Sequence, residues 1–213
     1  MRQLRQRRGY SNALSVAGDP QNDRDDRFGH CGDQTGDNVE IKSHLGADER
    51  ARRLGEPGCQ RDAFRATLGH FASGVVVITG MTPGGPTGFT CQSFFSLSLT
   101  PPLIAIAPGK SSRSWPSIAT SDAFCANVLS ADQEHLGQTF ARSGHDKFAD
   151  VAWRPALTGS PQLDGALAWI DCRIKETHDA GDHYLVVGAV VGLGNADGSR
   201  PLLYFRGQFN SLA

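Results

Sequence analysis

The chain has 213 residues and a formal net charge of −1, with 39% hydrophobic and 20% charged residues. That length is enough for one ordinary domain with a sizeable core and some additional residues. The near-neutral charge offers no strong field for nucleic acid or an anionic membrane surface, and the sequence has no apolar run long enough to cross a bilayer.

Residues 1–60 differ in composition from the rest of the chain. They contain two aromatic residues, Tyr10 and Phe28, among many Arg, Asp, Gly, Gln and Asn residues. Such a segment buries too little apolar surface to offset the entropy that is lost on ordering. We therefore expect residues 1–60 to form a poorly ordered N-terminal extension and residues 61–213 to form the folded domain. A tail that binds a partner is the functional alternative for the extension.

The domain is expected to begin with a short helix followed by antiparallel strands. Phe64, Leu68 and Phe71 recur at helical spacing, which predicts an amphipathic helix. The compact run 75–79 is rich in β-branched residues and is typical of a buried strand. The segment 80–86 is crowded with Gly and Pro, and it is expected to turn the chain back antiparallel.

The next stretch, 88–102, alternates at period two, which predicts a half-buried strand that ends at two prolines. One face carries Phe89, Cys91, Ser93, Phe95, Leu97 and Leu99, and the other carries Thr90, Gln92, Phe94, Ser96 and Ser98. The short hydrogen-bonding groups of the second face suit a polar, planar ligand that lies on a sheet. A Ser- and Thr-rich face exposed to water is the alternative that the pattern leaves open.

Hydroxyl groups and positive charge gather in the segment 108–122. Ser114, followed by tryptophan and proline, is typical of a helix N-cap with proline in the first turn. Hydroxyls, backbone amides and positive charges at a helix N-terminus suit a phosphate or another anion. Here they are supplied by Lys110, Ser111, Ser112 and Arg113. An ordinary capped turn with solvated Lys and Arg is the alternative.

The remaining elements complete an antiparallel pattern. A helix is expected at 132–141, capped by Asp132 with Leu136 and Phe140 facing inward. Further strands are expected at 103–107, 124–129, 167–177, 184–193 and 202–205, with a hairpin at 178–183 and a loop at 143–162. Six or so strands with three short helices predict a mainly β protein, built as a closed or partly closed antiparallel barrel with helices at its ends.

No constellation of residues indicates a metal site or a hydrolytic centre. His178, Asp179, Asp182 and His183 share one tight turn, so a hairpin is favoured over a metal cluster, and a single functional histidine remains open. The five cysteines are scattered without a CxxC motif, which fits neither a zinc site nor a disulfide framework and favours a reduced cytoplasm. The lack of a Ser-His-Asp, P-loop or HExxH arrangement favours chemistry that is carried by a bound cofactor.

Six segments are informative in combination. They are FRATLGHFASGVVVITG, GFTCQSFFSLSLTPPLIAIAPGKSSRSW, FCANVL, KFADVAWRP, IDCRIKETHDAGDHYLVVGAV and PLLYFRG. Together, over residues 61–209, they resemble the short-chain flavin reductases of two-component monooxygenases, including those that serve the hydroxylase of a steroid-degrading pathway. The resemblance implies a homodimeric, cytoplasmic split β-barrel that binds FMN or FAD and takes hydride from NADH or NADPH. It further implies that reduced flavin diffuses to a partner flavin-dependent oxygenase, which hydroxylates an aromatic or steroid-derived phenol.

The resemblance also implies a set of site residues. It places the isoalloxazine along Phe89, Thr90, Cys91, Gln92 and Ser93 with Ser96 close by, and the flavin phosphate beside Lys110, Ser111, Ser112 and Ser114. It places the nicotinamide beside His183, the candidate catalytic residue, and beside Tyr204, Phe205, Arg206 and Gly207. Because Cys91 and Ser93 belong to the apolar face, we expect a bulge or contacts through the backbone at that point.

Two alternatives remain open. One is a protein of the same fold that binds or carries FMN without reductase activity. The other, within the enzyme class, is a flavin-dependent oxidase or oxygenase that retains its flavin and needs an organic substrate. The joint presence of the GDH and LLYFRG segments favours the reductase.

Overall fold

A computed structural model describes residues 57–144, 146–197 and 200–212 of the chain. Most of the expected N-terminal extension, residues 1–56, lies outside the described residues. Helix α1 (Pro57–Leu68) begins ahead of the domain boundary expected at residue 61.

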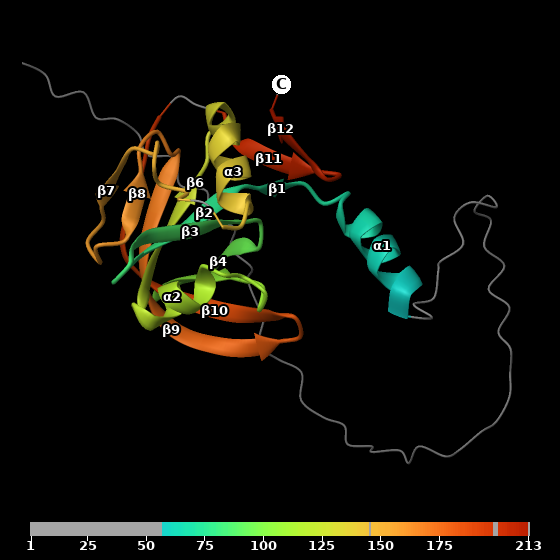
Figure 1. Cartoon of the computed structure of the whole chain (residues 1–213), viewed down its shortest axis with the longest axis horizontal. Coiled ribbons are helices and arrows are strands. Elements are labelled where there is room, and N and C mark those ends of the chain that lie inside the picture. The colour runs from blue at the N-terminus through green and yellow to red at the C-terminus, as the bar shows by residue number, and fades with distance from the viewer. Residues whose placement is uncertain (1–56, 145, 198–199, 213) are drawn as a thin grey trace, which may run out of the picture. The chain divides into compact units, whose positions relative to one another are not determined.

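Within the described residues, antiparallel strands make up three sheets, which confirms the predicted mainly β, antiparallel class (Figure 1). The largest sheet has seven strands in the order β3-β2-β6-β9-β10-β5-β4. These strands are β2 (Val76–Thr82), β3 (Gly85–Cys91), β4 (Phe94–Leu99), β5 (Pro102–Ile106), β6 (Ala123–Val128), β9 (Ala168–Ala180) and β10 (His183–Asn195). A three-stranded sheet contains β1 (Ser73–Gly74), β11 (Leu202–Phe205) and β12 (Gln208–Ser211), and a two-stranded sheet pairs β7 (Trp153–Pro155) with β8 (Pro161–Leu163).

The hydrophobic core lies on both faces of β2, as the β-branched run predicted. Val76 and Ile78 belong to one cluster of buried side chains, and Val75 and Val77 belong to a second cluster. Because successive side chains of a strand point to opposite faces, a run that is apolar at every position fills both clusters at once. Strand β2 is therefore buried between two layers.

Short helices follow the expected positions, but one of them is capped by a different residue. Helix α2 (Trp115–Thr120) follows β5, and a 3₁₀ turn, η1 (Ala131–Gln133), leads into α3 (Glu134–Ala141). The prediction that Asp132 is the cap is wrong, because Ser130 and Gln133 form a reciprocal capping box instead. The prediction that Leu136 and Phe140 face inward is confirmed, because both side chains are buried.

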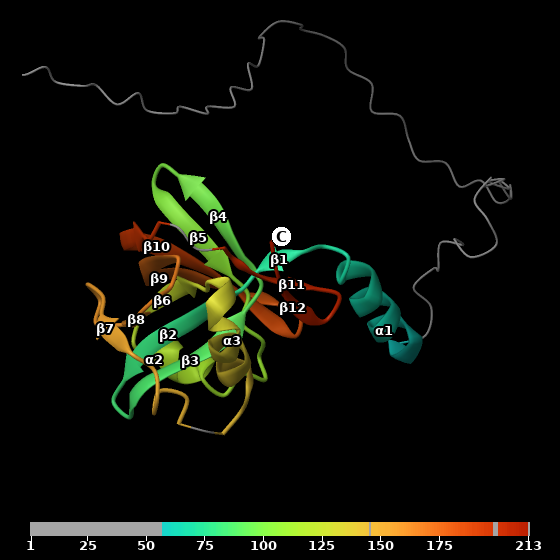
Figure 2. The same cartoon turned by 90° about the horizontal axis from the view of Figure 1, so that it is seen from above.

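Residues 88–102 do not form the single strand that their alternation predicts. Strand β3 ends at Cys91, the chain bends at Gln92 and Ser93, and β4 begins at Phe94. In that bend the Phe94 N–H donates to the Gln92 carbonyl at 2.9 Å. Strands β3 and β4 then lie at opposite edges of the seven-stranded sheet (Figure 2). Beside Cys91, where we expected a bulge or contacts through the backbone, the structure instead has a break between two strands.

The apolar face of α1 is not buried against the rest of the described chain. Phe64 and Leu68 are each 55% exposed, and Phe71 just beyond the helix is 80% exposed. Strand β4, at one edge of the large sheet, also carries the exposed side chains of Leu97 and Leu99. The predicted amphipathic helix is present, but the described residues leave much of its apolar face exposed.

Candidate functional site

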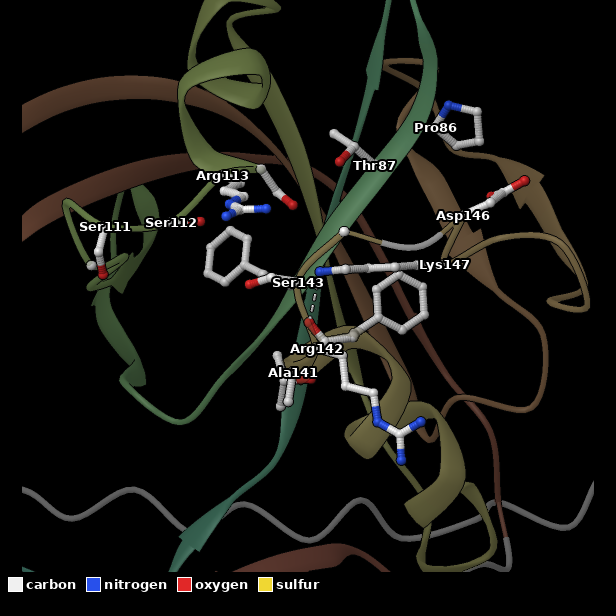
Figure 3. Close-up of a pocket in the computed structure, with 16 residues that line it drawn as sticks. Pro86, Thr87, Ser111, Ser112, Arg113, Ala141, Arg142, Ser143, Asp146 and Lys147 are labelled. Atoms are coloured by element: carbon white, nitrogen blue, oxygen red, sulfur yellow. Dashed lines mark hydrogen bonds between the residues drawn. The ribbon is translucent and has the colours of Figure 1, made fainter.

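A cavity of about 490 Å³ lies between β3, the loop that leads into α2, and the segment that follows α3 (Figure 3). Strand β3 contributes Pro86, Thr87, Phe89 and Thr90; the loop contributes residues 109 and 111–114; the third wall consists of residues 140–144, Asp146 and Lys147. The serine-rich loop that the sequence predicted as an anion site therefore lines the same cavity as part of the polar face of β3.

Positive charge predominates in the cavity wall. Arg113, Arg142 and Lys147 line it, and Asp146 contributes the single carboxylate among the described lining residues. This carboxylate accepts a hydrogen bond from the Phe148 backbone N–H at 3.0 Å. The Arg142 guanidinium extends away from Arg113 and Lys147 in Figure 3. The cavity thus suits an anion, which Arg113 and Lys147 would approach from two different walls.

Two serines fix the loop that leads into α2. Ser114 stands at the N-cap position, but its hydroxyl donates to the Gly88 carbonyl at 2.9 Å and makes no capping bond. The hydroxyl of Ser112 accepts the Trp115 N–H at 3.2 Å instead. The loop is therefore tied to β3 on one side and to the helix on the other, which preorganises its hydroxyls and amides around the cavity.

Strand β3 directs its side chains to two environments. The Thr90 hydroxyl donates to the Gly137 carbonyl of α3 at 2.6 Å, and the Phe89 ring packs edge-on against Trp115 with ring centroids 6.4 Å apart. Cys91 points into the core, where burial raises the pKa of its thiol to about 11. The thiol is therefore neutral at physiological pH, and a ligand beside Cys91 would meet its backbone.

Lys110 and His183 lie beside each other at the tip of the β9–β10 hairpin. The Lys110 ammonium forms an ion pair with Asp179 at 2.6 Å, and Lys110 does not line the cavity. The His183 imidazole is hydrogen-bonded to the Asp182 carboxylate at 2.6 Å, and this contact lowers the pKa of Asp182. A β-bridge joins His183 to Gly109, which does line the cavity. The hairpin tip therefore adjoins one end of the cavity.

The C-terminal residues that the sequence predicted for the site lie elsewhere on the chain. Tyr204 and Phe205 end β11, and Arg206 and Gly207 form the turn to β12, where both have positive φ. The Arg206 guanidinium contacts the His70 imidazole at 2.6 Å. These four residues do not line the cavity, and neither do Cys91, Gln92, Ser93, Ser96 and His183.

Sequence analysis did not predict Arg142 and Lys147 as cavity residues. Arg113 was predicted as one of the positive charges of the anion segment, although the family resemblance did not place it beside the flavin phosphate. Lys147 belongs to the KFADVAWRP segment, which carries part of the family resemblance. Nothing in the local pattern shows that this segment reaches β3, because the contact joins residues far apart in the sequence.

The residues that the structure describes contain no candidate membrane-spanning helix and no candidate metal cluster. No helix there is long and apolar enough to cross a membrane. Within the same residues, no group of three or more His, Cys, Asp or Glu side chains could hold a metal ion. His178 contacts Glu176 at 3.2 Å, away from the His183–Asp182 pair.

An antiparallel split barrel with a polar, cation-lined cavity beside an edge strand defines the structural class of the protein. The chain belongs to the family of the flavin reductase like domain, whose model matches residues 68–213.

Individual relatives agree with this assignment. The chain is 46% identical over 151 residues to the flavin-dependent monooxygenase, reductase subunit HsaB, of Mycobacterium tuberculosis H37Rv; the match covers 70% of this chain and 81% of HsaB. It is 44% identical to the FMN reductase (NADH) SmoA of Agrobacterium fabrum, over 69% of this chain and 83% of SmoA. A crystal structure of a nitrilotriacetate monooxygenase component B homologue from Mycobacterium thermoresistibile superposes with a TM-score of 0.71 at 45% identity, covering 73% of this chain and 88% of that one.

Proposed function

We propose that the protein transfers hydride from NADH or NADPH to FMN or FAD and releases the reduced flavin to a partner oxygenase that hydroxylates an aromatic or steroid-derived phenol. Membership of the flavin reductase family supports the flavin chemistry. HsaB is named as the reductase subunit of a monooxygenase, and SmoA is named as an FMN reductase (NADH). The cytoplasm, where both coenzymes are supplied, is the proposed compartment.

The observation that carries the proposal is the cavity beside β3. The preorganised loop before α2 lines this cavity with Ser111, Ser112 and Ser114. Its hydroxyls and amides, with the nearby cations, suit a flavin phosphate. The isoalloxazine is proposed to lie along Phe89, Thr90, Cys91, Gln92 and Ser93, near Ser96. Lys110 reaches a phosphate only if its ion pair with Asp179 opens.

For hydride transfer, the main role of the protein is to position the nicotinamide ring against the flavin ring. The bound flavin supplies the acceptor, and the transfer needs no acid or base from the protein. Holding two rings in attack geometry replaces roughly 7 to 11 kcal/mol of entropic and solvent cost. We propose that His183, at the end of the cavity, contacts the nicotinamide together with the segment Tyr204, Phe205, Arg206 and Gly207.

Steady-state oxidation of NADH and NADPH, each with FMN and with FAD, tests the proposal through the absorbance of the reduced nicotinamide. We expect turnover with at least one pair. If neither coenzyme is oxidised with either flavin, the proposed reductase activity is contradicted. Flavin binding without turnover would favour the alternative, a protein that carries FMN without reducing it.

Single alanine substitutions of Ser112 and His183 are expected to affect flavin and coenzyme binding differently. The change Ser112→Ala should raise the Kd for FMN about fivefold to tenfold, because it removes a phosphate hydrogen bond worth about 1 to 1.5 kcal/mol. The change His183→Ala should raise the KM for NADH and leave the Kd for FMN within about twofold. Ser117→Ala, on the exposed side of α2, is the matched control. Equal effects of His183→Ala on both ligands would contradict this division.

A homodimer is the proposed assembly, and it rests on exposed apolar side chains. Phe64, Leu68 and Phe71 lie on or beside α1, and Leu97 and Leu99 lie on the edge strand β4. Apolar groups at two such places are better buried than left in water. The free edge of β4 also offers backbone hydrogen-bonding groups to another chain.

The change Phe71→Asp is therefore expected to convert the protein from dimer to monomer at micromolar concentrations, because a buried carboxylate without a partner is strongly unfavourable. Light scattering coupled to size-exclusion chromatography measures the change in mass. Leu157→Asp, at a side chain that is 78% exposed in the β7–β8 connection, is the matched control and should leave the mass unchanged. A wild-type protein that elutes as a monomer would contradict the proposed assembly.

A further inference from the structure

Lys147 holds three parts of the cavity together. Its ammonium donates to the Gly88 carbonyl of β3 and to the Phe140 carbonyl of α3, at 3.0 Å each. The Gly88 carbonyl also accepts the Ser114 hydroxyl of the serine loop at 2.9 Å. One backbone oxygen thus joins β3, the serine loop and the segment after α3, and the lysine reaches it from the cavity side (Figure 3).

The charge of Lys147 has no counter-charge among the described residues. Every ion pair found there involves other side chains, and both partners of the ammonium are neutral carbonyls. Burial lowers the pKa of Lys147, as expected for a half-buried ammonium without a carboxylate. An ammonium has three N–H donors, so one remains after these two bonds.

Arg113 brings a second cation to the same part of the cavity. Its Nη1 atom lies 3.8 Å from the position that a Cβ atom of Gly144 would occupy, so the guanidinium reaches from the serine loop to the segment that precedes Lys147. The two cations line the same cavity as Ser111 and Ser112, Arg113 from the serine loop and Lys147 from the segment after α3. An anion at these serines would therefore be within the field of both charges.

We propose that Lys147 is a phosphate-binding residue of the flavin site, which donates its remaining N–H to the flavin phosphate opposite Arg113. This inference rests on the proposed function and adds the residues that select a phosphorylated flavin. A phosphate supplies the missing counter-charge, and the carbonyl bonds of Lys147 fix the ammonium before the ligand arrives. Such preorganisation favours charge-assisted hydrogen bonds, which are stronger than neutral ones.

The test compares FMN with riboflavin, which has the same ring system and no phosphate. Quenching of flavin fluorescence gives the Kd of both flavins for the wild type, Lys147→Met and Lys147→Arg. We expect Lys147→Met to raise the Kd for FMN at least about tenfold and the Kd for riboflavin less than about twofold. Lys147→Arg should restore most of the affinity for FMN. Lys175→Met, at an exposed lysine that pairs with Glu176, is the matched control.

Three results would overturn the inference in a wild-type protein that reduces flavin. They are an unchanged Kd for FMN, an equal loss of affinity for FMN and riboflavin, and a rise in the KM for NADH without a change in the Kd for FMN. An equal loss of affinity for both flavins would show that Lys147 has a purely structural role. A rise in the KM for NADH alone would show that the charge of Lys147 acts on the coenzyme.

Circular dichroism first establishes that each variant is folded. If Lys147→Met does not fold, Lys147→Gln takes its place, because its amide still donates hydrogen bonds but carries no charge. A wild-type protein that neither binds nor reduces any flavin would instead contradict the proposed function itself.

Discussion

Replacing Phe140 with alanine is expected to lower the free energy of unfolding by about 3 to 5 kcal/mol, because the ring is buried in the second core cluster. Phe140 is 1% exposed and packs edge-on against Phe148 with ring centroids 5.1 Å apart. Its removal leaves a void between α3 and β3. Because Phe140 also lines the cavity and its carbonyl accepts a bond from Lys147, the affinity for FMN should fall as well.

Urea unfolding followed by circular dichroism measures the first effect, and flavin fluorescence measures the second. Phe140→Leu keeps most of the volume and is expected to lower the unfolding free energy by less than about 1.5 kcal/mol. A loss in Phe140→Ala no larger than in Phe140→Leu would show that the ring does not support the wall as described.

The change Gly88→Ala is expected to have the second largest effect. A Cβ atom at this position would lie 2.8 Å from the Ile78 carbonyl oxygen and 3.0 Å from the Phe140 ring, closer than van der Waals contact allows. Strand β3 must then shift, at about 1 to 3 kcal/mol of stability. The Gly88 carbonyl, which accepts hydrogen bonds from Ser114 and Lys147, would move with the strand. We therefore expect the Kd for FMN to rise by about tenfold or more.

Gly74→Ala provides the control, because a Cβ atom there meets no atom within 4 Å. Unfolding in urea and FMN titration are carried out on both variants. The account requires Gly88→Ala to be the less stable variant and the weaker binder. Equal stability and equal affinity of the two variants would contradict the close approach at Gly88.

Buried strands could be predicted from the sequence with good accuracy. The run Val75–Thr79 is apolar or β-branched at every position, and the structure buries it on both faces. A strand that is covered on both sides has no polar face, so its sequence signal is continuous and strong. The same reason explains the prediction of β6, where the buried residues Phe124 and Ala126 contribute to the core.

The break in the stretch 88–102 shows what a local pattern cannot specify. Alternation continues in the letters from Phe89 to Leu99, yet Gln92 and Ser93 bend the chain and send β3 and β4 to opposite edges of the sheet. The pairing partner of a strand is set by contacts with distant residues. The alternation of apolar and polar residues therefore identified the residues that form strands, but not how many strands they form.

The cationic wall of the cavity escaped prediction for a related reason. Lys147 reaches Gly88 across 59 positions of sequence, and no periodicity encodes such a contact. Lys110, in contrast, lies in the serine-rich segment and was predicted to lie beside the flavin phosphate, but the structure pairs it with Asp179 on the β9–β10 hairpin. The sequence shows where a charged residue stands in the chain, but it does not show the direction in which the side chain points.

The measurement that tests the central claim most directly is anaerobic reduction of free flavin. A catalytic amount of the protein is mixed with a large molar excess of FMN and NADH, and the oxidised-flavin absorbance is followed. We predict that all of the FMN is bleached, because each molecule of flavin must bind, accept hydride and leave. Bleaching limited to one equivalent of flavin per protein, or no bleaching with either FMN or FAD, would contradict a reductase that releases its reduced flavin.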